Sequence, residues 1–158
     1  MADKKQHHER FAAPGKPDGN GCFEILAITA GEGNGWHFSR EVLEHSLPLW
    51  EGVETFVDHG ESDGGRSVKD LAGVCSEPFA DQLTGGIRLK LRATGPSGAL
   101  LEEIAREWLA SPAPRADIGF SADLLFTSEG HDVKRILKVL SLDLVVNPAR
   151  GGGDPARA

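Results

Sequence analysis

Cysteine is scarce in this chain, long apolar runs are missing, and acidic side chains outnumber basic ones. Cys22 and Cys75 are the two cysteines, too few for a disulfide framework, so we expect both to be packing residues in a protein of a reducing cytosol. The 17 basic and 24 acidic residues give a formal charge of 17 − 24 = −7, which argues against general nucleic-acid binding because phosphate neutralisation needs clustered lysine and arginine. No run approaches the roughly 18 apolar residues of a membrane span, and residues 1–20 lack the apolar core of a signal peptide.

What remains is the composition of a soluble globular protein. A chain of 158 residues is long enough for one domain with a real hydrophobic core. Residues 1–20 are polar and rich in proline and glycine, so we expect a flexible leader. The predicted domain spans residues 21–150, and the glycine-rich residues 151–158 have the composition of a tail, a linker or the stump of a longer chain.

Apolar, β-prone segments outnumber helical ones and mostly follow one another directly. They predict a mainly β fold of the α+β class, an antiparallel sheet or barrel with two helices. Ser39 is the expected N-cap of the first helix, which runs to about Leu47 before Pro48. The second helix starts at Ser97, and its apolar face is formed by Leu101, Ile104, Ala105 and Trp108. Strands are expected at residues 22–29, 53–57, 71–76, 87–93, 118–126, 133–137 and 139–146.

Three short segments carry residue types that nucleophilic hydrolysis needs, namely a hydroxyl, a base that titrates near neutral pH and a carboxylate that orients the base. The segments are VDHG at 57–60, GFSAD at 119–123 and SLDLVVNPA at 141–149. Each sits in an apolar, strand-like run. Together they nominate three candidate residues: His59, Ser121 and Asp143.

Ser121 lies in a strand, which excludes the α/β-hydrolase nucleophile elbow. In that motif a glycine follows two residues after the serine and a helix begins, whereas here Asp123 takes that place and Leu124 continues the strand. A serine in a strand is usually a small polar residue with no further role. His59 taken alone is a solvated loop histidine, or a metal ligand together with Asp58 and Glu61, although the spacing matches no calcium loop.

Asp143 interrupts a run that otherwise predicts a buried strand. A carboxylate there is costly unless it is paired or hydrogen-bonded. A histidine partner would meet that need, and an inward-pointing charge on an edge strand is the equal alternative.

Read in order, FVDHG, IGFSADLLF and LSLDLVVNPA resemble the prohead (procapsid maturation) proteases of tailed bacteriophages, relatives of the herpesvirus assemblins. That family carries a histidine just after a strand, then a G-x-S segment, then a closing strand that runs into Pro-Ala. The resemblance covers about residues 24–149. It implies an assemblin-like, seven-stranded antiparallel β-barrel surrounded by helices, and a serine endopeptidase without a cofactor.

By the same resemblance, Ser121 is the nucleophile and His59 the general base. The third member varies among relatives: assemblins use a second histidine, many phage members an acidic residue, and some place a glutamate where this chain has Ser141. Asp143 is therefore the predicted third member, and His131, in an expected hairpin turn, is the fallback. Arg150 is the nearest counterpart of an assemblin arginine that stabilises the oxyanion.

The resemblance also implies substrates and a location. The substrates are the phage scaffold protein, the extension of the major capsid protein and the protease itself, inside the assembling prohead in the host cytoplasm. It implies neither a nucleic-acid nor a membrane partner and is compatible with a homo-oligomer. Two alternatives stay open: a non-catalytic capsid-assembly or scaffold module of the same fold, and a metal-dependent hydrolase that uses His59, Asp58 and Glu61.

Overall fold

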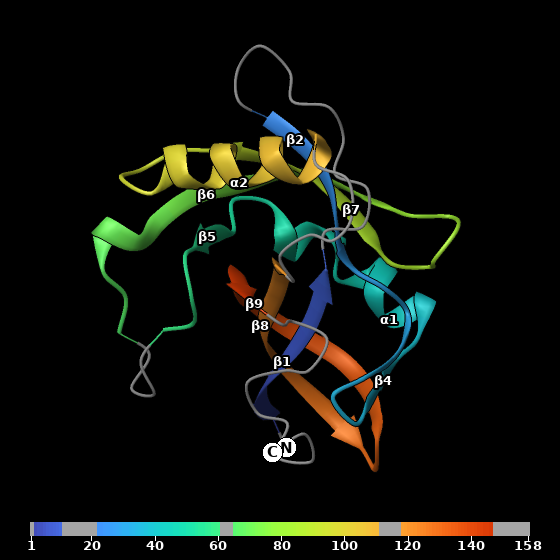
Figure 1. Cartoon of the computed structure of the whole chain (residues 1–158). Helices are drawn as coiled ribbons and strands as arrows, with labels where there is room; N and C mark the ends of the chain where they lie inside the picture. The colour runs from blue at the N-terminus through green and yellow to red at the C-terminus, as the bar shows by residue number, and fades with distance from the viewer. Residues whose placement is uncertain (1, 11–21, 61–64, 111–117, 147–158) are drawn as a thin grey trace.

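The computed structural model of the chain describes residues 2–10, 22–60, 65–110 and 118–146, and of residues 2–10 and 108–110 the backbone alone. Within these ranges the fold is mainly β, as predicted, with few helices (Figure 1). Its strands form two sheets, one of five strands in the order β1-β8-β9-β4-β3 and one of four in the order β2-β7-β6-β5. The elements are β1 (Ala2–Arg10), β2 (Cys22–Ile28), β3 (Gly31–Gly33), β4 (Trp36–Phe38), α1 (Arg40–His45), η1 (Leu47–Trp50), β5 (Glu54–Phe56), η2 (Val68–Asp70), β6 (Leu71–Ala80), β7 (Ile87–Ala93), α2 (Gly98–Ala110), β8 (Ile118–Glu129) and β9 (Asp132–Val146).

The four-stranded sheet and α2 enclose much of the core. β7 alternates as its sequence predicts, with Ile87, Leu89 and Leu91 fully buried. α2 lies across β6 and β7 in the upper part of Figure 1. Its Leu101 and Ala105 are fully buried, which confirms the predicted apolar face where side chains are described; the side chain of Trp108 lies outside them.

A long hairpin of β8 and β9 forms the centre of the five-stranded sheet. The turn is made at Gly130, which has a φ of 61°, a left-handed conformation that glycine adopts without strain. The sequence predicts two strands on either side of Lys138, whereas β9 is continuous from Asp132 to Val146. Register shifts in the β8–β9 ladder let the pairing continue along the whole strand.

Part of the expected leader is ordered as a strand. Residues 2–10 form β1, which pairs antiparallel with β8 over its full length. The prediction of a flexible leader is therefore wrong for these residues, because main-chain pairing with a sheet edge requires no apolar side chains. The rest of the leader and residues 147–158 lie outside the described residues.

Residues just after β5 connect the two sheets. Val57 forms a parallel bridge with Leu144 of β9, and the Asp58 N–H donates to the Leu144 carbonyl at 2.9 Å. β5 itself belongs to the four-stranded sheet, so this segment runs from one sheet to the other. Closure of the sheets into a barrel stays a prediction.

The first helix is shorter than its sequence pattern suggests. The Ser39 hydroxyl accepts from the Val42 N–H at 3.1 Å, as expected of an N-cap, but α1 ends at His45 and a 3-10 turn, η1, follows. Pro48 lies inside that turn, where its missing N–H is tolerated.

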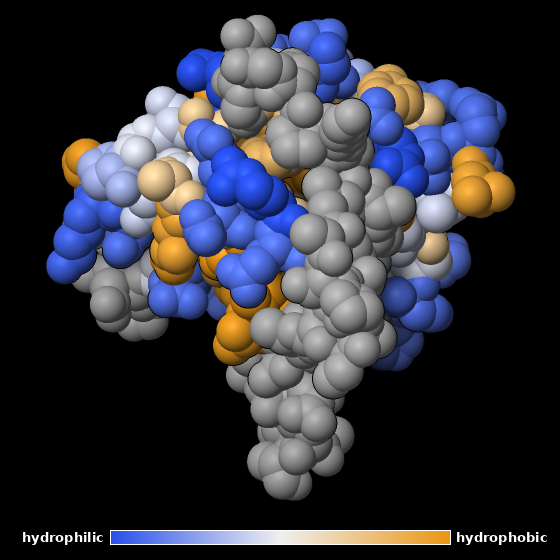
Figure 2. Space-filling view, turned by 45° about the horizontal axis from the view of Figure 1, so that its top comes forward, coloured by the Kyte–Doolittle hydropathy of each residue, from blue (hydrophilic) through white to orange (hydrophobic). Residues whose placement is uncertain are grey.

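The face of the molecule drawn in Figure 2 is mostly polar where its residues are described. In Figure 2 most of the described atoms of the visible face are hydrophilic, and hydrophobic residues appear in separate groups. Within the described part of the chain, no helix combines the length and apolar character needed to cross a membrane.

Candidate active site

A block of buried polar side chains lies at the middle of the β8–β9 hairpin. Ser121 is opposite Asp143, and Asp123 is opposite Ser141. Side chains two residues apart on a strand share a face, so all four lie on one face, and all four are buried. The other face is apolar, with Phe120, Ala122, Leu142 and Leu144. Such a polar block needs a specific reason, because each buried polar group loses its hydration.

Asp143 is fully buried, and its carboxylate is shared by two partners. His59 Nδ1 lies 3.1 Å from Oδ2. Arg66 Nη2 donates to both oxygens, at 3.0 Å to Oδ1 and 2.8 Å to Oδ2. At this point β9 is flanked by β8 and by residues 57–58, so the alternative of an edge-strand charge does not hold. His59 thus lies where the sequence predicts a histidine partner of Asp143.

The backbone of residues 57–59 explains how His59 reaches this carboxylate. Val57 and Asp58 run alongside Leu144, the residue next to Asp143. Asp58 then takes a left-handed conformation with a φ of 65°, which aspartate tolerates better than most residues. The chain turns there, and the His59 side chain, 26% exposed, lies against β9 with its Nε2 atom shielded from solvent.

Ser121 is the nearest cross-strand neighbour of Asp143. Cβ atoms of directly opposed residues lie about 5 Å apart in an antiparallel pair. Ser121 is fully buried, and among the described residues no hydrogen-bond partner lies within range of its hydroxyl oxygen. The structure thus places His59 in contact with the Asp143 carboxylate and Ser121 opposite Asp143 on the hairpin. Ser121 Oγ is hydrogen-bonded to neither of them.

The fallback residues lie elsewhere. His131 is in the β8–β9 turn, and its Nδ1 contacts the Gly35 carbonyl oxygen at 3.1 Å. It belongs to the end of the hairpin and not to the polar block. Ser141 lies in the block, where its hydroxyl accepts from Arg66 at 2.8 Å. Arg150 lies outside the described residues.

The hypothesis of a metal-dependent hydrolase requires a cluster of metal ligands. No group of three or more histidine, cysteine or acidic side chains is arranged to hold a metal ion within the residues that the structure describes. Glu61, one of the proposed ligands, lies outside that part of the chain.

Arg66 is the residue of this site that the sequence pattern misses. It follows a stretch of glycines and charges at 60–65 that predicts a solvated loop, so nothing local distinguishes it from a surface arginine. The available signal is indirect: a carboxylate in a buried strand requires a cation, and the sequence alone does not say which one.

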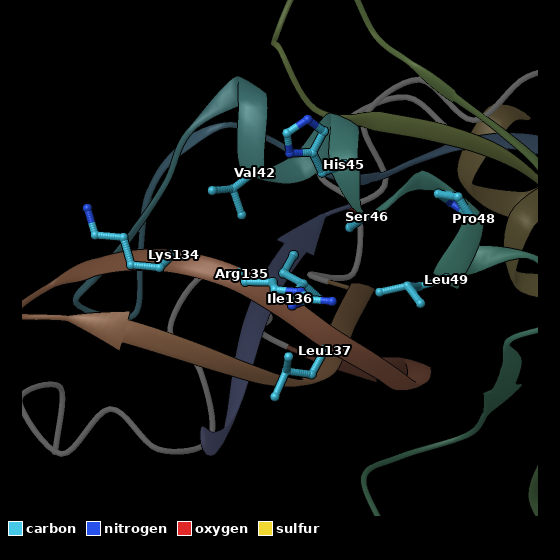
Figure 3. Close-up of a pocket in the computed structure, with 9 residues that line it drawn as sticks. All are labelled: Val42, His45, Ser46, Pro48, Leu49, Lys134, Arg135, Ile136 and Leu137. Atoms are coloured by element: carbon cyan, nitrogen blue, oxygen red, sulfur yellow. The ribbon is translucent and has the colours of Figure 1, made fainter. Parts of the chain in front are cut away.

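A separate pocket lies between α1, η1 and the first half of β9. It measures about 410 Å³ and is lined by Val42, His45, Ser46, Pro48, Leu49 and residues 134–137 (Figure 3). Leu137 is six residues from Asp143, which at the rise of a β-strand is roughly 20 Å. This pocket is therefore distinct from the polar block.

No protein-family model matches the chain, and no curated protein matches its sequence. A match appears among solved structures, the bacteriophage T4 capsid assembly protease, gp21. The alignment has a TM-score of 0.58 and 15% sequence identity, and it covers 94% of this chain and 97% of that chain. At this level of sequence identity, the similarity supports a shared fold and nothing further. From this likeness we conclude that the chain has the fold of a phage capsid assembly protease over nearly its whole length.

Proposed function

We propose that this chain is a serine endopeptidase of phage prohead maturation, with Ser121 as nucleophile, His59 as general base and Asp143 as the third member. One observation carries the proposal: His59 Nδ1 contacts the Asp143 carboxylate at 3.1 Å, directly across the hairpin from Ser121. The fold shared with a capsid assembly protease supports the proposed role in capsid maturation. The resemblance of the three segments to prohead proteases and assemblins supports the choice of residues.

The tautomer of His59 follows from the chemistry of its partner. An ionised carboxylate only accepts hydrogen bonds, so Nδ1 carries the hydrogen and Nε2 keeps a lone pair. In the proposed reaction Nε2 takes the Ser121 proton as Oγ attacks a peptide carbonyl carbon. The same nitrogen then protonates the leaving amine, and an acyl-enzyme forms. Water, deprotonated by His59, releases the acyl group and restores the serine. Backbone N–H groups, with Arg150 as the proposed helper, stabilise the oxyanion.

Access to Ser121 requires movement. Its side chain is fully buried, and a peptide bond must come within about 3.5 Å of the attacking oxygen. β1 runs beside β8, with His8 opposite Ser121. Displacement of a neighbouring segment is therefore part of the proposed catalytic cycle.

Capsid-related proteins are the proposed substrate class, in keeping with the likeness to a capsid assembly protease. In finer detail we propose the scaffold protein, the extension of the major capsid protein and the chain itself. Cleavage would take place inside the assembling prohead in the host cytoplasm. A homo-oligomer is part of this proposal by resemblance to the assemblins.

A non-catalytic capsid-assembly module of the same fold is the second candidate. The full burial of Ser121 favours it, because an active nucleophile must meet its substrate.

Labelling with a fluorophosphonate separates the two candidates. The full chain is expected to be labelled at Ser121, and Ser121→Ala and His59→Ala are expected to abolish both labelling and cleavage of co-expressed scaffold protein. Ser128→Ala, on the same strand but away from the polar block, is the matched control. Cleavage that persists in Ser121→Ala contradicts the proposal. A full chain that binds scaffold but is neither labelled nor cleaves it is the non-catalytic module.

A further inference from the structure

We propose that Arg66 is a positioning residue of this site: it provides the permanent counter-charge of Asp143 and holds the segment that carries His59. This inference rests on the proposed function, because positioning matters only if His59 and Asp143 act together. It assigns a role to a residue that neither the sequence motifs nor the fold likeness indicates.

Contacts with β9 are the first support. Arg66 Nη2 lies 3.0 Å from Asp143 Oδ1, 2.8 Å from Asp143 Oδ2 and 2.8 Å from Ser141 Oγ. One nitrogen with two hydrogens therefore serves three acceptors, so at least one of these bonds is shared. The arginine is 22% exposed and the carboxylate is fully buried, so the charge pair is shielded from solvent on the carboxylate side.

Contacts with the His59 segment are the second support. Arg66 Nη1 donates to the Asp58 carbonyl oxygen at 3.1 Å, the peptide that leads into His59. The guanidinium also lies over the Phe56 ring, 4.6 Å from its centroid, in the geometry of a cation–π contact. One side chain thus joins β5, the peptide before His59 and the carboxylate on β9.

Gly60 leaves room for this arrangement. A Cβ atom at position 60 would lie 2.7 Å from Arg66 Nε and 3.0 Å from its Cδ. Even alanine would therefore push the guanidinium away from its partners. Gly60→Ala offers a way to displace Arg66 without removing any charge.

Chemistry explains why a histidine alone does not suffice. In the proposed reaction His59 alternates between neutral and charged forms, whereas a buried carboxylate needs a counter-ion at every stage. Arginine stays charged throughout. The fork of Nη1 and Nη2 contacts both segments: Nη2 donates to both carboxylate oxygens of Asp143, and Nη1 donates to the Asp58 carbonyl. The guanidinium therefore holds the carboxylate in place relative to the segment that carries His59.

The cation has a consequence for pH. Among the described residues, the ionisable side chains that contact Asp143 are those of His59 and Arg66. Asp58 precedes His59 in the sequence, and Asp123 lies on the same face of β8 as Ser121. Replacing this cation with a neutral side chain is expected to favour proton uptake by the His59–Asp143 pair, whichever of the two receives the proton.

The test compares Arg66→Met, Arg66→Lys and Gly60→Ala in the full chain. Arg88→Met is the matched control, because Arg88 Nε pairs with Asp81 at 3.1 Å and is 21% exposed, away from the site. Two quantities are measured for each variant: the pH midpoint of the His59 ring signal by NMR, and the rate of fluorophosphonate labelling as a function of pH.

We expect Arg66→Met to raise the NMR midpoint by about one pH unit or more. On the acid limb this shift corresponds to about tenfold slower labelling at a given pH. Arg66→Lys is expected to keep the midpoint near that of the parent chain, yet to lower the plateau rate about tenfold, because an ammonium group does not reproduce the fork. Gly60→Ala should lower the plateau similarly, and Arg88→Met should change neither quantity.

An unchanged midpoint in Arg66→Met, equal to that of Arg88→Met, overturns the inference. Circular dichroism checks that each variant folds. If Arg66→Met does not fold, Gly60→Ala takes its place, and a plateau labelling rate equal to that of the parent chain then overturns the inference. If the parent chain is never labelled, the proposed function fails; the NMR midpoint still decides whether Arg66 sets the protonation of the pair.

Discussion

At the scale of single residues, the buried side chains of the polar block differ in whether their polar atoms are hydrogen-bonded. Within the described ranges, Asp143 has two hydrogen-bonding partners and Ser141 has one. The Ser121 hydroxyl has none among the described residues. A buried hydroxyl that has given up water without a replacement destabilises the fold.

We therefore expect Ser121→Ala to stabilise the protein by about 1–2 kcal/mol. Urea unfolding of both forms measures the difference. Ser46→Ala is the contrasting variant, because the Ser46 hydroxyl donates to the Leu43 carbonyl at 2.6 Å and accepts from Trp50 Nε1 at 3.0 Å. Ser46→Ala should therefore destabilise the protein. A Ser121→Ala variant that is also less stable than the parent chain would contradict the view that the buried Ser121 hydroxyl destabilises the fold.

Asp143→Asn tests the tautomer of His59. An asparagine amide that donates toward Nδ1 selects the form with hydrogen on Nε2, which is no longer a base. We expect the labelling rate of Ser121 to fall by on the order of 10³-fold or more. Asp81→Asn, which alters another carboxylate paired with an arginine, should leave the rate within twofold. Full labelling of Asp143→Asn would remove Asp143 from the site.

These residues also show how far sequence reasoning extends. His59, Ser121 and Asp143 each stand out against an apolar strand or its end, so the pattern identifies them. Arg66 lies in a charged, glycine-rich loop, where an arginine is the expected residue. Arg66 becomes part of the site because the fold brings it to Asp143, 77 residues further along the chain.

At the scale of elements, β1 is the strand whose presence was least expected. Its sequence, ADKKQHHER, offers no apolar side chain beyond one alanine, yet it pairs with β8 across nine positions. Main-chain hydrogen bonds therefore account for the pairing, and such bonds depend on N–H groups.

Replacing both Lys5 and Gln6 with proline should release β1. N–H directions alternate along a strand, so one of two adjacent prolines removes a donor that faces β8. We expect labelling of Ser121 to become several-fold faster and β8 amide protons to exchange faster. The double alanine variant at the same positions keeps both N–H groups and should match the parent chain. Equal exchange in the proline and alanine variants would show that β1 does not protect β8.

The turn between β6 and β7 gives a pH prediction. Hydrogen bonds from Thr84, foremost from its hydroxyl at 2.6 Å, hold the pKa of the Asp81 carboxyl below its usual value, with Arg88 adding to the effect against partial burial. A lowered pKa in the folded state means that Asp81 stabilises the fold above about pH 4 and that this contribution is lost as the pH falls through the folded-state value.

Asp81→Asn should therefore cost about 2 kcal/mol at pH 7. The difference from the parent chain should shrink steadily below pH 4, as measured by urea unfolding across the pH range. A difference that stays constant down to pH 2 would mean that the side chain acts through its shape and not through its charge.

At the scale of the whole molecule, the candidate site lies where two sheets meet. Ser121 and Asp143 belong to the five-stranded sheet, whereas His59 and Arg66 lie between β5 and β6 of the four-stranded one. The parallel bridge between Val57 and Leu144 joins the segment after β5 to β9 next to these residues. Formation of the site thus depends on the packing of the whole fold.

Cys75 reports on that packing. It is 1% exposed, in the middle of β6, and burial raises the pKa of its thiol to about 12. We expect the Cys75 thiol to resist Ellman's reagent at pH 8 in the folded protein and to react once urea unfolds it, with a midpoint equal to that of the loss of circular dichroism. A Cys22→Ser background isolates the signal. Reaction of Cys75 well before global unfolding would show that the four-stranded sheet opens separately.

The sequence by itself determined the β-rich class, the strands with clear alternation such as β7, the N-cap at Ser39 and the three residues that interrupt apolar runs. Local pattern carries these features, because side-chain periodicity and capping act over a few neighbouring residues. Only the tertiary structure decided that β1 pairs with β8, that β9 is one strand, and that Arg66 serves Asp143. Those outcomes depend on which sheet edges and charges lie together in space. A carboxylate in a buried strand requires a cation, but the local sequence does not identify the residue that provides it.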